Sequence, residues 1–121
     1  MSCLYRALAH FVPNDDPNMV RQKICNFLAL NRELPLASSE MVVLWESNLD
    51  LPSYVSRMRH GSAWGGATEI QAFCELYAFG VSCHNLRRDR VQWIQEFIPK
   101  TGVCTKKVNI TWNGGHFEPM R

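Results

Sequence analysis

The sequence lacks the features that would place this protein in a membrane or on nucleic acid. No apolar run approaches the roughly 20 residues of a membrane span, and no secretory signal opens the chain. The formal net charge of the 121 residues is only +2, and the basic residues are scattered along the chain. Nucleic-acid binding requires a larger, clustered basic patch. We therefore expect neither a nucleic-acid partner nor a membrane partner.

The cysteines show neither disulfide spacing nor metal-binding spacing. No Cys-x-x-Cys pair occurs, and the cysteine count is odd. This distribution is typical of a reducing compartment and predicts a cytoplasmic location. A zinc site made of Cys83, His84 and Cys104 would match no common ligand spacing, so we expect no metal cofactor. The five cysteines are Cys3, Cys25, Cys74, Cys83 and Cys104.

The remaining composition is that of one globular domain over residues 1–121. Hydrophobic residues make up 46% of the chain, and no repeat, low-complexity segment or domain boundary interrupts it. Helical patterns crowd the first two-thirds and strand patterns the last third, which predicts an α+β fold with helices packed on a small sheet. The expected helices cover residues 3–11, 17–31, 41–49, 53–58 and 67–79, and the expected strands cover 81–86, 91–98, 107–112 and 116–119.

Several of these boundaries follow from capping and breaking residues. Asp16 is placed to cap the second helix, with Pro17 at its first position. Gly80 is placed to end the helix over 67–79 in the left-handed conformation. Residues 91–98 fit a helix or a strand, and we favour a strand because β-branched and aromatic residues are dense there and Pro99 closes the segment.

Cys3 stands where the chain enters its first helix, which the spacing of Leu4, Leu8 and Phe11 predicts. Unpaired backbone N–H groups and the helix dipole at such a point favour the reactive thiolate and offer donors to an oxyanion. The alternative is a small buried apolar residue, as most free cysteines are. This stretch alone favours the alternative.

A thiol hydrolase also needs a base and a group that orients the base. His116 follows a glycine turn at the other end of the sequence, and Glu118 lies two residues beyond it. In an extended segment both side chains point to the same face, where a carboxylate could hold the imidazole in one tautomer. The remaining histidines are less suitable because they lie within a helix, a loop and a strand: His10, His60 and His84.

Three segments, in order and with matching spacing, resemble the ovarian-tumour (OTU) domain cysteine proteases, a class of deubiquitinases. Cys3-Leu-Tyr-Arg-Ala-Leu matches the family's nucleophile helix. Trp64-Gly-Gly-Ala-Thr-Glu-Ile-Gln-Ala matches its central Trp-Gly-Gly segment and the helix that follows. Asn109-Ile-Thr-Trp-Asn-Gly-Gly-His-Phe-Glu-Pro matches its terminal strand, turn and histidine. The resemblance therefore spans essentially the whole chain, in a compact form like the viral and mobile-element members.

The resemblance implies a papain-type fold with a mainly antiparallel sheet, and it reverses the preference for a structural Cys3. By this resemblance Cys3 is the nucleophile, His116 the general base and Glu118 the third catalytic residue. It implies cleavage after the Gly-Gly end of ubiquitin or a ubiquitin-like protein, without a cofactor, by a monomer in the cytoplasm, or the host cytoplasm if the protein is viral. The alternatives are a polyprotein-processing protease of the same fold, with the chain then part of a larger polyprotein, and an inactive ubiquitin-binding module.

The family usually has Asp-Gly-Asn or a similar loop before its cysteine, and this loop helps to form the oxyanion hole. Here only Met1 and Ser2 precede Cys3. Either the sequence is part of a longer protein or the hole is built differently. We expect backbone N–H groups near Ser2 and Cys3 to hold the oxyanion.

The other candidate substrate-binding residues flank the two glycine turns. Trp64, Gly65 and Gly66 fit equally a core tryptophan with tight turns and a channel wall for an extended glycine-rich tail. Trp112 and Asn113 precede the histidine and could flank the cleft. The strand spacing of Trp112 favours a place in the core.

Overall fold

The structure is a computed structural model, and it describes residues 3–30, 51–60, 65–86, 94–100, 103–114 and 116–120. The fold is α+β, as predicted. The expected helix over 41–49 lies outside the described residues. The helices are α1 (Cys3–Ala9), α2 (Pro17–Leu30), α4 (Leu51–Met58) and α5 (Ala67–Tyr77). The strands are β1 (Phe79–Asn85), β2 (Ile94–Phe97), β3 (Lys106–Trp112) and β4 (Phe117–Pro119).

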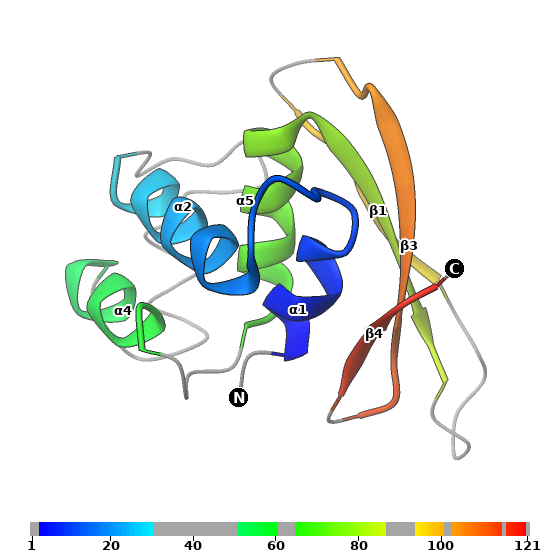
Figure 1. Ribbon diagram of the computed structural model, residues 1–121, viewed down its shortest axis with the longest axis horizontal. Coiled ribbons are helices and arrows are strands. Elements are labelled where there is room, and N and C mark those ends of the chain that lie inside the picture. Colours follow the sequence, from blue (N-terminus) through cyan, green and yellow to red (C-terminus); the bar gives the residue numbers. More distant parts are fainter. Residues whose placement is uncertain are drawn as a thin grey trace.

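The strands form one sheet in the order β2-β1-β3-β4. The two outer pairs, β1 with β2 and β3 with β4, are antiparallel, whereas the central pair, β1 with β3, is parallel. The sheet is therefore mixed, with two of its three pairs antiparallel. The described helices all lie on one side of this sheet (Figure 1).

Alternating burial along β3 explains how the sheet faces the helices. Val108 and Ile110 are buried, while Lys107 and Asn109, which alternate with them, are exposed. The buried residues join a core made with α1, α2 and α5. No helix in the described part of the chain is long and apolar enough to cross a membrane.

The start of α2 confirms the predicted cap. The Asp16 carboxylate accepts a hydrogen bond from the Met19 backbone N–H at 2.8 Å, and Pro17 is the first helical residue. The side chain thus satisfies one of the N–H groups that a helix start leaves unpaired. This cap fixes where the chain turns from α1 into α2.

The predicted left-handed end of α5 at Gly80 is wrong. The left-handed residue is Ala78, with φ 58° and ψ 37°, and Gly80 already belongs to β1. Thr105 holds the turn, because its N–H and its hydroxyl both donate to the Ala78 carbonyl, at 2.7 and 3.0 Å. Gly80 instead lies in a closely packed position of β1, where a Cβ would be 3.2 Å from Cys104 Sγ and 3.3 Å from Lys107 Cγ.

Candidate active site

The two ends of the chain meet because α1 packs against β4, the edge strand of the sheet. α1 buries its apolar face, including Leu4 and Leu8, in the core, and this fixes Cys3 at its first turn. His116 follows a turn between β3 and β4, where Gly114 has φ 105° and the Asn113 N–H donates to the His116 carbonyl at 3.2 Å. The sheet edge and the helix start thus place the two candidate catalytic side chains.

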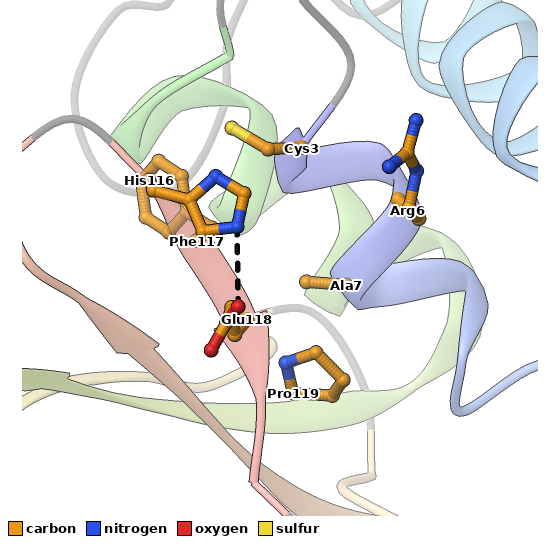
Figure 2. Close-up of a pocket in the computed structure, with 7 residues that line it drawn as sticks. All are labelled: Cys3, Arg6, Ala7, His116, Phe117, Glu118 and Pro119. Carbon is orange, nitrogen blue, oxygen red and sulfur yellow. Dashed lines mark ion pairs between the residues drawn. The ribbon is translucent and has the colours of Figure 1, made fainter.

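Cys3 and His116 line one cavity of about 350 Å³ between α1 and β4. Figure 2 shows the Cys3 side chain pointing toward the His116 ring. The structure therefore brings together the predicted nucleophile, base and third residue. The lining of this cavity, called here the thiol cavity, is Cys3, Arg6, Ala7, His116, Phe117, Glu118 and Pro119.

Glu118 is placed to orient the imidazole. Its Oε1 lies 3.3 Å from His116 Nε2, and the other ring nitrogen, Nδ1, lies on the side of Cys3 (Figure 2). The side chains of His116 and Glu118 are 44% and 66% exposed, so their ion pair contributes little to stability. At this distance the carboxylate favours one orientation and one tautomer of the imidazole ring.

A second cavity, of about 470 Å³, lies beside the first, and Phe117 lines both. We call this second cavity the glycine cavity. Its lining includes three of the predicted substrate-binding residues: Gly65, Gly66 and Trp112. Trp112 also packs against the core, as its strand spacing predicted. Asn113 lies at the hairpin turn and is in neither lining. Ser2 and Trp64 lie outside the described residues.

Gly65 is the point at which the wall of the glycine cavity meets α1. A Cβ on Gly65 would lie 2.5 Å from Leu4 Cδ2 and 3.2 Å from the Tyr5 ring, whereas a Cβ on Gly66 would meet nothing within 4 Å. Of these two glycines, Gly65 alone is closely packed, so only at Gly65 would a side chain meet the core. The helix that carries Cys3 rests directly on this position.

A family model described as OTU-like cysteine protease matches residues 2–117. The chain belongs to the OTU-like cysteine protease family. No curated protein sequence gives a significant match.

Solved structures of OTU domains have the same fold as this family member. The OTU domain of OTUD1 aligns with a TM-score of 0.75 at 15% identity, covering 98% of this chain and 77% of that one. The viral OTU protease of Farallon virus aligns with a TM-score of 0.73 at 19% identity, covering 99% and 78%. An OTU deubiquitinase from Wolbachia pipientis wMel, bound to ubiquitin, aligns with a TM-score of 0.71 at 18% identity, covering 99% and 89%.

Three of the other cysteines of this OTU-like domain lie in apolar, buried surroundings. Burial raises the pKa of Cys25 to about 11, of Cys74 to about 12 and of Cys83 to about 11. Cys83 and His84 lie on opposite faces of β1, and the His84 ring contacts Asn109 at 3.0 Å. Among the described residues, no group of three or more potential ligands could hold a metal ion.

These surroundings predict selective alkylation. At neutral pH, iodoacetamide should modify Cys3 well before Cys25, Cys74 and Cys83, because a raised pKa keeps a thiol protonated until the pH approaches that value. Peptide mass mapping after timed labelling gives the order. Equal labelling rates in the folded protein would show that the thiol cavity does not activate Cys3.

Two site residues were missed by sequence reasoning. Arg6 lines the thiol cavity one helical turn after Cys3, and the three-residue spacing could have indicated it. The second is Glu69 on the first turn of α5, which is only 1% exposed and contacts Gly66. Nothing in its local sequence signals that burial.

Proposed function

We propose that this protein is a thiol hydrolase that cleaves the peptide or isopeptide bond after the Gly-Gly C-terminus of ubiquitin or a ubiquitin-like protein. The observation that carries the proposal is the thiol cavity, in which Cys3 from the first helix faces His116, the residue just before the last strand, with Glu118 on the far ring nitrogen. Membership in the OTU-like cysteine protease family supports the reaction class. The ubiquitin-bound Wolbachia structure supports the choice of substrate.

The mechanism follows from these three side chains. His116 takes the proton of the Cys3 thiol, and the sulfur attacks the carbonyl carbon of the terminal glycine and forms a C–S bond, while the carbonyl electron pair moves to oxygen. Collapse of this intermediate breaks the C–N bond, and the proton held by His116 goes to the leaving amine. His116 then takes a proton from water, which attacks the thioester and releases the carboxylate and the Cys3 thiolate. Backbone N–H groups at the start of α1 are the candidate donors to the oxyanion.

The glycine cavity gives the substrate tail a path to Cys3. It adjoins the thiol cavity at Phe117, and Gly65 and Gly66 present no side chain to an approaching backbone. We expect two glycines at this wall to favour a glycine tail over bulkier sequences. We place the reaction in the cytoplasm, with a monomeric enzyme.

A ubiquitin-propargylamide probe tests the proposal. We expect a covalent adduct on Cys3, detected by the mass shift and by peptide mapping, and no adduct with the C3A variant. Binding without capture would instead support a ubiquitin-binding module. If the probe is neither bound nor captured, the ubiquitin assignment is overturned, and cleavage of a polyprotein becomes the function to examine.

Replacing Glu118 with glutamine should lower kcat by roughly tenfold with little change in KM, because the contact to His116 is exposed and its charge is partly screened. Steady-state kinetics on a ubiquitin C-terminal fluorogenic substrate gives both constants. Asn113→Ala is the matched control at the same hairpin and should be nearly silent. The reverse pattern, with a silent Glu118→Gln and a slow Asn113→Ala, would transfer the orienting role to Asn113.

A further inference from the structure

Glu69 carries a side chain that is almost fully buried, at 1% exposure, on the first turn of α5. Each of its carboxylate oxygens accepts a hydrogen bond. Oε1 accepts the Gly66 backbone N–H at 2.7 Å, and Oε2 accepts the hydroxyl of Tyr54 from α4. A buried carboxylate is costly unless such donors satisfy it, and here both donors are themselves held by the fold.

The two donors belong to different parts of the fold. We call Gly65 and Gly66, which line the glycine cavity, the glycine wall. Gly66 lines the glycine cavity, whereas Tyr54 is a buried core residue of α4. Glu69 therefore ties the wall to the helical core. The wall also lies close to α1, because a Cβ added to Gly65 would be 2.5 Å from Leu4 Cδ2 and 3.2 Å from the Tyr5 ring, and Arg21 lies over that ring at 4.1 Å. The wall is thus clamped between the core carboxylate and the helix that carries Cys3.

We infer that Glu69 is a positioning residue that fixes the Gly65–Gly66 wall in the conformation that accepts an extended substrate tail. The inference rests on the proposed function and adds to it a determinant of substrate binding. A wall held in place before the substrate arrives reduces the ordering cost of binding. A helix cap alone would not need this arrangement, because an exposed carboxylate or hydroxyl satisfies a helix start equally well.

Glu69→Ala removes both hydrogen bonds and should raise KM for a ubiquitin C-terminal fluorogenic substrate by roughly tenfold, with kcat changed by less than about threefold. The rate of Cys3 alkylation by iodoacetamide should stay unchanged, because this small reagent needs no wall. Tyr54→Phe keeps the Gly66 contact and should give a smaller rise in KM. This milder variant also decides the question if Glu69→Ala does not fold.

Glu75→Ala is the matched control. Glu75 lies on the same helix and accepts a backbone N–H, from Lys100 at 2.9 Å, but it lines neither cavity. It should lower the thermal midpoint without raising KM. A rise in KM as large as that of Glu69→Ala would show a general loss of structure and overturn the inference.

Amide hydrogen exchange at Gly66 tests the clamp without any substrate. Exchange should be at least about tenfold faster in Glu69→Ala than in the wild type, since the N–H loses its acceptor. Unchanged exchange overturns the clamp alone. Absence of turnover by the wild-type protein overturns the proposed function and the substrate part of the inference, while the exchange rate still decides whether Glu69 holds the wall.

Discussion

Replacing Cys3 with alanine should reduce hydrolysis of a ubiquitin C-terminal fluorogenic substrate by on the order of 10⁴-fold or more. The reason is chemical, because Cys3 supplies the only sulfur among the described residues that line the thiol cavity. The buried cysteines cannot replace it, since the raised pKa of Cys25, Cys74 and Cys83 keeps those thiols protonated at neutral pH. Steady-state kinetics at saturating substrate gives the size of the loss.

His116→Ala should cost nearly as much, and the double variant should be no worse than either single one. Catalytic groups that act as one unit show this non-additivity, because removing either group removes the shared step. Both variants should keep the thermal midpoint of the wild type within a few degrees, since His116 is partly exposed and Cys3 loses only one sulfur atom. Losses that multiply in the double variant would mean that the two side chains act independently.

Local sequence predicted the elements that carry the site, because local rules decide them. Asp16 and Pro17 mark the start of α2 within one turn, and the alternation along β3 separates Val108 and Ile110 from their exposed neighbours. Ala78 shows the limit of these rules. Ala78, not Gly80, adopts the left-handed conformation. Thr105, which is distant in sequence, holds it there by donating two hydrogen bonds to the Ala78 carbonyl.

The pairing of distant segments could not be predicted in this way. The parallel register of β1 with β3, in which Cys83 lies opposite Ile110, depends on contacts that no short window contains. The pairing of Cys3 with His116 was proposed from residue type and position, and the family resemblance supported it, but no local rule predicted that the two ends of the chain meet. Glu69 shows the same limit for a single side chain, because its burial depends on Tyr54 from another helix.

Gly65→Ala should lower kcat by roughly 100-fold and destabilise the fold by about 1–3 kcal/mol. The added Cβ would lie 2.5 Å from Leu4 Cδ2 and 3.2 Å from the Tyr5 ring. Leu4 and Tyr5 are 1% and 0% exposed, so both side chains pack in the core. We expect a rotation of Leu4 to relieve only part of the overlap and a shift of α1 to relieve the rest, so that Cys3, the residue before Leu4, moves relative to His116.

Gly66→Ala is the matched control one residue away. Gly66 has an extended backbone with φ −151°, and a Cβ there meets no atom within 4 Å, so the fold should keep its stability within about 0.5 kcal/mol. Because Gly66 lines the glycine cavity, its methyl group should raise KM while leaving kcat and Cys3 alkylation near the wild-type values. Thermal unfolding, iodoacetamide labelling and steady-state kinetics on both variants separate the two effects. Equal losses of stability and kcat in Gly65→Ala and Gly66→Ala would contradict the packing of α1 on Gly65 as the cause.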